Sequence, residues 1–185
     1  ENIPSKRIQR IRETGGRTTL YGRLRKDKPS YTISTYFNRP GNGTHIHPGQ
    51  DRVISVREAA RLQSFSDDYR FFGTKGSLCI QIGNAVPPLL AYAVAKQIKQ
   101  KTNARTALDL FAGAGGLSHG FKMAGYRVLV ANDNYSPACK TYELNNPGTF
   151  MVEGDIRNES VKENIYRYID KESIDIVVGG PPCQG

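Results

Sequence analysis

A glycine-rich turn between an apolar strand and a helix is the feature that most restricts how this chain can fold. The run 107–111 predicts a buried strand, the glycines of 113–116 predict a tight turn, and 117–123 predicts the start of a helix. In this arrangement the backbone amides of the turn can approach a ligand closely. Ser118 stands where a GxGxxG fingerprint has its third glycine, which disfavours a nicotinamide enzyme.

Strands and helices alternate from this turn onward. The pattern predicts strands at 107–111, 127–131, 149–152 and 174–178, and helices at 117–124, 136–144 and 160–169. Such alternation predicts an α/β fold with a mostly parallel sheet and a ligand beyond the carboxyl ends of its strands. Upstream, a helix is expected at 57–63 behind the cap residue Ser55. Another is expected after Pro88, with an apolar face made of Leu89, Ala93, Val94 and Ile98.

Acidic residues follow two later strands of this alternation. Asp133 lies about twenty residues beyond Gly113, where this architecture places a carboxylate that binds ribose hydroxyls. Asp155 follows the next strand. Either residue could instead be a helix cap or a solvated loop carboxylate. The spacing from Gly113 favours a functional role for Asp133.

The last expected strand leads into the sequence Gly-Gly-Pro-Pro-Cys-Gln-Gly at 179–185. A cysteine after such a turn is presented at the sheet edge, where its thiolate can act as a nucleophile. Cysteines in proline-rich turns are also commonly incidental. The tripeptide ending at Cys183 is therefore weak evidence by itself, and its meaning depends on the rest of the chain.

Taken together, six blocks of the chain resemble the motifs of the DNA (cytosine-5) methyltransferases. The segments 109–117, 132–134, 154–156 and 179–185 match the family's first four motifs, and 56–68 and 81–88 resemble its ninth and tenth. The resemblance covers roughly residues 50–185. It implies a Rossmann-like methyltransferase fold that depends on S-adenosylmethionine, of which this chain holds an incomplete part.

The resemblance also assigns site residues. Cys183 is the expected nucleophile, and Pro182 shapes its loop and contacts the target base. No metal is implied. The residues expected to bind S-adenosylmethionine are Phe111, Ala112, Gly113, Gly115, Asp133, Asn134, Asp155, Ile156, Asn84, Ala85 and Val86.

In this family the cysteine attacks C6 of a cytosine that is flipped out of the duplex, and C5 then takes the methyl group. The resemblance thus implies cytosine C5 methylation of DNA through a covalent cysteine adduct, in a restriction–modification or defence system. Two alternatives stay open. One is a relative that methylates a transfer RNA, and the other is a non-catalytic cofactor-binding subunit of a split methyltransferase.

The order of the blocks differs from the usual one, because motifs nine and ten precede motif one. A short connector at 100–105 joins them. Since the termini of compact domains often lie close together, a circular permutation can preserve a fold. A junction between two tandem methyltransferases is the rival interpretation.

No block in the 185 residues matches the family's Glu-Asn-Val motif, which supplies a carboxylic acid to the base. Loss of a general acid costs ~10²–10⁴-fold in rate. The resemblance therefore implies that this chain is a poor catalyst alone. A second polypeptide or chain segment is expected to supply the missing motifs.

Charge divides the chain near the connector. Residues 1–105 hold 19 Lys and Arg against 7 Asp and Glu, whereas 106–185 hold 7 against 10. A basic, glycine-rich segment suits the phosphate backbone of double-stranded DNA, although basic runs are also often only solvated surface. The expected DNA-binding residues are Arg17, Arg23, Arg25, Lys26 and Gln184.

We expect three units: 1–50, the basic tail of a target-recognition region; 51–105, with motifs nine and ten; and 106–185, the first half of the catalytic domain. No apolar run approaches the ~20 residues of a membrane span, and no signal peptide is evident. Three cysteines without a CxxC pair fit a reducing bacterial cytoplasm, with Cys79 and Cys139 as packing residues. His45 and His47 share one side of a strand pattern but lack a third metal ligand.

Overall fold

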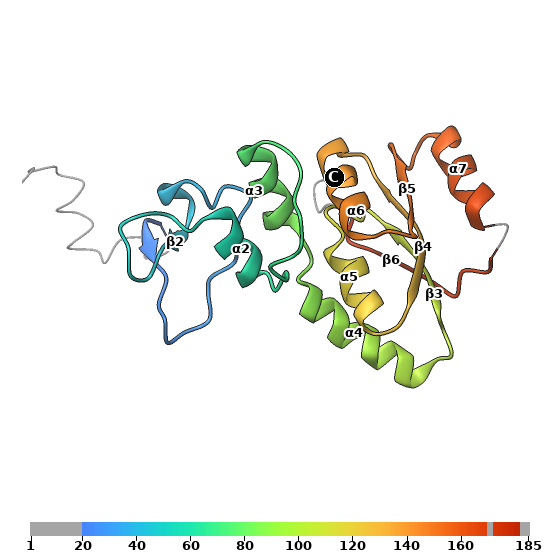
Figure 1. The fold of residues 1–185 in the computed structure, drawn as a ribbon, viewed down its shortest axis with the longest axis horizontal. Helices are drawn as coiled ribbons and strands as arrows, with labels where there is room; N and C mark the ends of the chain where they lie inside the picture. The colour runs from blue at the N-terminus through green and yellow to red at the C-terminus, as the bar shows by residue number, and fades with distance from the viewer. Residues whose placement is uncertain (1–19, 170–171, 182–185) are drawn as a thin grey trace, which may run out of the picture.

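The computed structural model describes residues 20–169 and 172–181. Its main sheet has four parallel strands in the order β5–β4–β3–β6 (Figure 1). These strands are β3 (Thr106–Leu110), β4 (Arg127–Asp133), β5 (Phe150–Glu153) and β6 (Ile176–Gly179). The predicted α/β fold with a parallel sheet is confirmed, and each predicted strand lies within two residues of its expected bounds.

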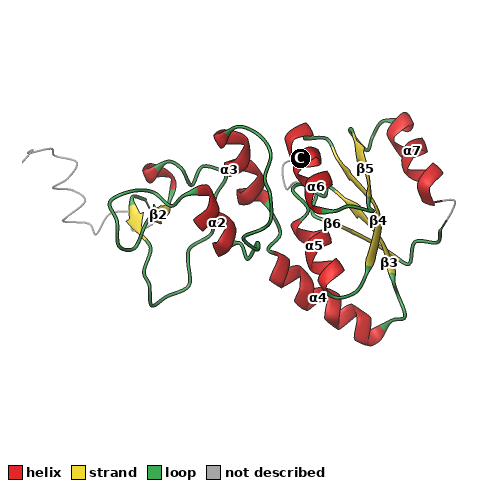
Figure 2. Ribbon diagram, viewed as in Figure 1, coloured by secondary structure: helices red, strands yellow, loops and turns green. Residues whose placement is uncertain are grey.

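Helices cover both faces of this sheet (Figure 2). They are α5 (Gly116–Met123), α6 (Ser136–Asn145) and α7 (Glu159–Ile169). Val161 and Ile165 of α7 pack against Leu108 of β3. Ala107, the neighbouring residue on β3, packs with Phe121 of α5. Since adjacent residues of a strand point to opposite faces, α7 and α5 lie on opposite sides of the sheet.

Helix α4 (Pro88–Lys101) packs directly on α5. Its predicted apolar face is wrong at Leu89 and Val94, which are 56% and 47% exposed, whereas Ala91 and Ala95 are buried. Ile98 of the predicted face does pack against this core. Gly120 of α5 explains the difference. A Cβ at Gly120 would collide with Ala91, so the two helices approach too closely for large side chains between them.

A second core lies on the N-terminal side of α4 (left in Figure 1). It is built by α2 (Val56–Leu62), α3 (Lys75–Asn84), the short strands β1 (Gly22–Arg23) and β2 (Thr44–Ile46), and the 3-10 turn η1 (Pro40–Asn42). Phe37, Ile54 and Ile82 are among its buried side chains. Ser55 caps α2 as predicted, because its hydroxyl accepts from Glu58 N and the Glu58 carboxylate accepts from Ser55 N.

One stretch, Lys75–Lys101, is long and apolar enough to cross a membrane by length and composition. In the structure this stretch is two helices, α3 and α4, separated at Ala85–Pro87. Cys79 and Ile82 of α3 are buried in one core, and Ala91 and Ala95 of α4 in the other. The stretch therefore contributes one helix to each of the two folded cores.

Candidate cofactor and nucleic-acid site

The turn between β3 and α5 has the backbone conformation of a ligand-binding loop. Gly113 and Gly115 have φ of +54° and +90°, in the left-handed region that favours glycine. Phe111 also has a positive φ, +57°, which costs on the order of 1–3 kcal/mol in a residue of this type. A Cβ placed at Gly113 would meet no atom within 4 Å, while Ala112 is buried below. The loop is thus strained, and open on one side.

Asp133, at the end of β4, holds this loop in place. One carboxylate oxygen accepts from Gly113 N at 2.8 Å and the other accepts from Tyr135 N at 2.8 Å. Each carboxylate oxygen has a second lone pair that can accept from a ligand. Asn134 lies next to it and is exposed.

The break between α3 and α4 lies against the same loop. A Cβ at Gly116, the first residue of α5, would collide with the carbonyl oxygen of Val86. A Cβ at Gly180, just beyond β6, would lie 3.8 Å from Val86 Cγ2. Ala85 is half-buried and Asn84 is exposed at the end of α3. The structure therefore brings segments from three expected motifs to one edge of the sheet.

Asp155 and Ile156 follow β5 and lie in different environments. The Asp155 carboxylate accepts from the Arg157 guanidinium at 2.6 Å, and this lowers the pKa of Asp155 to about 2. Ile156 packs against the core cluster that contains Val152 and Val161. Asp155 is thus ionised and paired with a cation in this structure.

A buried polar cluster lies beneath the glycine loop, and the sequence did not predict it. The Asp109 carboxylate accepts from Ser118 Oγ at 2.6 Å, and Ser118 Oγ lies 2.7 Å from Tyr142 Oη. Burial raises the pKa of Asp109 to about 7. Asp109 lies inside the block matched to motif one, and its signal in the sequence is a lone carboxylate within the apolar run 107–111.

Hydrogen bonds join the segment after α2 to the second half of the chain. Tyr69 Oη donates to Ala114 O at 2.6 Å, directly under the glycine loop. Arg70 N donates to Asn145 Oδ1 at 2.8 Å, and Phe72 N donates to Thr141 Oγ1 at 2.8 Å. The loop is therefore supported by residues from both sides of the connector.

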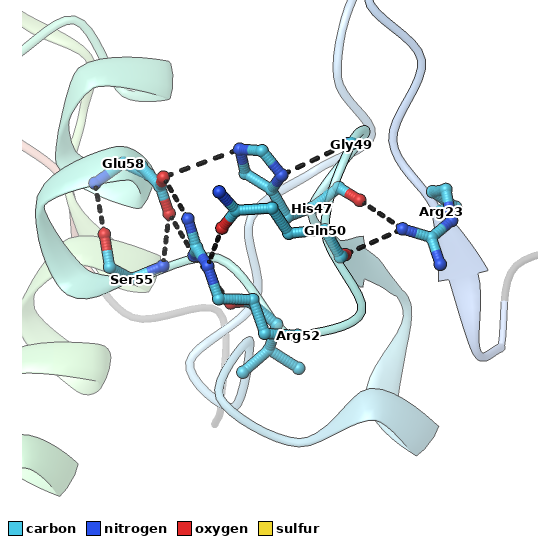
Figure 3. Close-up of polar contacts among 8 residues, drawn as sticks. Arg23, His47, Gly49, Gln50, Arg52, Ser55 and Glu58 are labelled. Atoms are coloured by element: carbon cyan, nitrogen blue, oxygen red, sulfur yellow. Dashed lines mark hydrogen bonds and ion pairs between the residues drawn. The ribbon is translucent and has the colours of Figure 1, made fainter.

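The basic residues of β1 and the following loop have different surroundings. Arg23 donates to the carbonyl oxygens of His47 and Gln50, both at 2.7 Å (Figure 3). It also pairs with Asp51. Arg25 pairs with Asp27, and Lys26 lines a hollow beside His47. The remaining predicted residues, Arg17, Pro182, Cys183 and Gln184, lie outside the described residues.

The two histidines singled out by the sequence bind different partners. Buried His45 has its Nε2 3.2 Å from Ser34 Oγ, while His47 Nδ1 accepts from Gly49 N. Within 20–169 and 172–181, no group of three His, Cys, Asp or Glu side chains could hold a metal ion. Cys79 and Cys139 are buried free thiols, as expected of packing residues.

A family model for C-5 cytosine-specific DNA methylases matches residues 1–100 and 105–185. The chain belongs to this family. The gap between the two matched segments falls where α4 leads into β3. Helix α4 thus lies in the first matched segment except for its last residue, and the strand–turn–helix unit β3–α5 lies in the second.

Curated relatives are similar over about half of the chain. The type II methyltransferase M.AgeI of Thalassovita gelatinovora is 47% identical over 93 residues, which cover 50% of this chain and 21% of the relative. The DNA (cytosine-5)-methyltransferase 3 of Arabidopsis thaliana is 40% identical over 106 residues, or 57% and 8% of the two chains. A solved E. coli structure described as a prophage-encoded DNA modification methyltransferase is 34% identical, covers 44% of this chain and 24% of its own, and has a TM-score of 0.39. Each alignment spans less than a quarter of the relative's length.

Proposed function

We propose that this chain forms part of an enzyme that methylates C5 of cytosine in DNA with S-adenosylmethionine. The observation that carries the proposal is the convergence of the open glycine loop, Asp133 and Val86 at the carboxyl edge of the parallel sheet. Ligands of open α/β sheets bind at this edge. The membership in the C-5 cytosine-specific DNA methylases supplies the reaction class.

The residues at this edge suit S-adenosylmethionine. Bound there, this cofactor would supply an electrophilic methyl group. The glycine loop offers backbone amides, and the Asp133 carboxylate can accept from ribose hydroxyls. The exposed ring of Phe111 offers an apolar surface to the adenine, and Asn84–Val86 can close over the methionine end. Asp155 can accept from the adenine amino group only if Arg157 shares or leaves its carboxylate.

Cys183 would form the covalent bond to the target base. Its thiolate adds to C6 of an extruded cytosine, which makes C5 nucleophilic toward the methyl donor. After transfer, a base removes the C5 proton and the thiolate leaves C6, which restores the aromatic ring and the free enzyme. Pro182 restricts the backbone before the cysteine and limits the positions that the sulfur can adopt.

We further propose that the two matched segments belong to one catalytic domain in permuted order, with double-stranded DNA as the partner. Further sequence would carry the remaining motifs. The name of M.AgeI suggests a type II restriction–modification setting, and buried free thiols suit a reducing cytoplasm. We also propose that the chain consists of the three units 1–50, 51–105 and 106–185.

Calorimetric titration with S-adenosylmethionine tests the proposal. We expect binding in the range of about 1 µM to 1 mM, weakened at least tenfold by Asp133→Asn or Asn84→Ala. Glu163→Ala, an exposed change on α7, is the matched control and should leave the affinity unchanged. A folded chain that does not bind S-adenosylmethionine would contradict the proposal.

A further inference from the structure

A cationic hollow lies between the loop after β1 and helix α2. Its volume is about 400 Å³. Its apolar lining includes Leu24, Ile54 and Leu62, and its cations come from Arg25, Lys26, Lys28 and Arg61. Arg25 and Arg61 pair with Asp27 and Asp67, whereas Lys26 and Lys28 form no ion pair within the described part of the chain. The two lysines are therefore available to an anion.

The one acidic residue that lines the hollow is neutralised within the protein. Both oxygens of Glu58 accept from the Arg52 guanidinium at 2.8 Å, and one also accepts from Ser55 N (Figure 3). This pairing with Arg52 holds the pKa of Glu58 far below its usual range. Glu58 therefore stays ionised and paired, and the lysines determine the charge that an incoming ligand meets.

One wall of the hollow is a β-hairpin with a fixed tip. Ile46 and Val53 form an antiparallel bridge, and His47 N donates to Arg52 O at 2.8 Å. Arg23 spans the tip from the other side, because its Nη1 donates to both His47 O and Gln50 O (Figure 3). The guanidinium thus holds two carbonyl oxygens through Nη1 and the Asp51 carboxylate through Nη2, whereas a lysine ammonium has only one nitrogen to donate from.

Lys26 reaches this tip. A Cβ at Gly49 would lie 3.9 Å from Lys26 Nζ, so the ammonium lies over the hairpin backbone at the edge of the hollow. The position of Lys26 thus depends on the shape of the tip, and the shape of the tip depends on Arg23.

We propose that this hollow seats the phosphate backbone of duplex DNA, with Lys26 and Lys28 as phosphate ligands and Arg23 as the residue that positions the hairpin tip. The inference rests on the proposed function, which names DNA as the partner. The proposal gives the basic residues different roles. Arg23 contacts the protein, and Lys26 and Lys28 contact DNA. Phosphate contacts of this kind set the register of a protein on the duplex without reading its sequence.

The salt dependence of binding tests the lysines. Fluorescence anisotropy of a mixed-sequence duplex is measured with the full 185-residue chain at several KCl concentrations. Each phosphate that a cation neutralises contributes about 0.9 to the slope of log Kobs against log[KCl], so Lys26→Ala/Lys28→Ala should lower the slope by about 1.8. Lys96→Ala/Lys101→Ala removes the same charge from exposed positions on α4 and should not change the slope.

The charge-preserving variant Arg23→Lys tests the positioning role. We expect DNA affinity to fall about five- to tenfold with an unchanged salt slope. Amide exchange at Gly49 should become faster, while affinity for S-adenosylmethionine stays the same. A variant that binds DNA like the wild type would overturn the positioning role.

Other outcomes distinguish a failure of the phosphate seat from a failure of DNA as the partner. An equal decrease of slope in the α4 control, or no decrease in Lys26→Ala/Lys28→Ala, overturns the phosphate seat while leaving DNA as the partner. A wild-type chain that binds S-adenosylmethionine but binds transfer RNA in place of duplex DNA overturns the seat and the DNA assignment together. The cofactor titration reports separately on the proposed enzyme class.

Discussion

The buried hydroxyl of Tyr69 connects the two matched segments at the scale of single residues. Tyr69 is 2% exposed, and the carbonyl that it contacts belongs to Ala114, which is also 2% exposed. Tyr69→Phe would leave this carbonyl without its donor. We expect the free energy of unfolding to fall by about 1–3 kcal/mol, measured by urea denaturation.

Tyr126 provides the matched control for this change. Its buried hydroxyl has no hydrogen-bond partner within the residues that the structure describes. Tyr126→Phe should therefore change the free energy of unfolding by less than about 0.5 kcal/mol, or increase it. Equal decreases in both variants would show that the Tyr69–Ala114 bond does not support the loop.

Asp109 gives stability a specific pH dependence. Its pKa is raised by burial from 3.8 to about 7 in the folded chain, so the folded state binds the proton more tightly than the unfolded state. The contribution of Asp109 is then fully present below about pH 4 and is lost as the pH rises through 7. Between pH 5 and pH 8, we expect the free energy of unfolding of the wild type to fall by about 2–3 kcal/mol relative to that of Asp109→Asn.

Urea denaturation of both proteins at several pH values measures this difference. Asparagine keeps the acceptor for Ser118 and removes only the titration, which makes the comparison selective. Parallel pH profiles for the two proteins would mean that Asp109 does not titrate in this range.

The sequence predicted the residues of the glycine loop but not their support. Gly113 and Asp133 are found through local spacing, and the structure joins them by a hydrogen bond. Tyr69 and Asn145 contribute through contacts between segments far apart in the chain, which leave no local periodicity. Arg23 was predicted to bind DNA because it is a basic residue in a basic segment. Its hydrogen bonds to two carbonyl oxygens of the hairpin are visible only in the structure.

At the scale of elements, the packing of α4 on α5 depends on Gly120. Replacing a helix glycine by alanine ordinarily stabilises a protein by about 0.5–1 kcal/mol. At Gly120 the new Cβ would collide with Ala91 and with the Pro88 carbonyl, and overpacking costs typically ~1–3 kcal/mol. We expect Gly120→Ala to lower the midpoint of urea unfolding.

Gly76→Ala in α3 is the control, because no atom lies within 4 Å of a Cβ at that position. It should stabilise the protein by up to about 0.5–1 kcal/mol. A stabilising Gly120→Ala would contradict the close approach of α4 and α5.

Elements with strong periodicity were predicted well, and those decided by neighbours were not. The strands of the main sheet have apolar runs that identify them in isolation, and Ser55 identifies the start of α2. Helix α3 was not predicted, because its mixed sequence Ser-Leu-Cys-Ile-Gln-Ile lacks a clear apolar face. The buried face of α4 is set by Gly120 across the interface, which the pattern of α4 alone does not contain.

For the whole molecule, we propose that two segments in reversed order build one cofactor site. The contacts of Val86 with the start of α5 and of Tyr69 with the glycine loop cross the connector and join the two cores. The basic segment with the cationic hollow belongs to the first core, and the glycine loop to the second. A single chain thus combines the proposed DNA surface with the proposed cofactor site.

Hydrogen–deuterium exchange with and without S-adenosylmethionine measures whether both segments contact the cofactor. One cofactor site made by both segments predicts slower exchange at Ala85–Val86 and in the loop 112–116 at the same cofactor concentration. Slower exchange confined to residues 106–185, with 80–90 unchanged, would contradict it and assign the two segments to separate methyltransferase units.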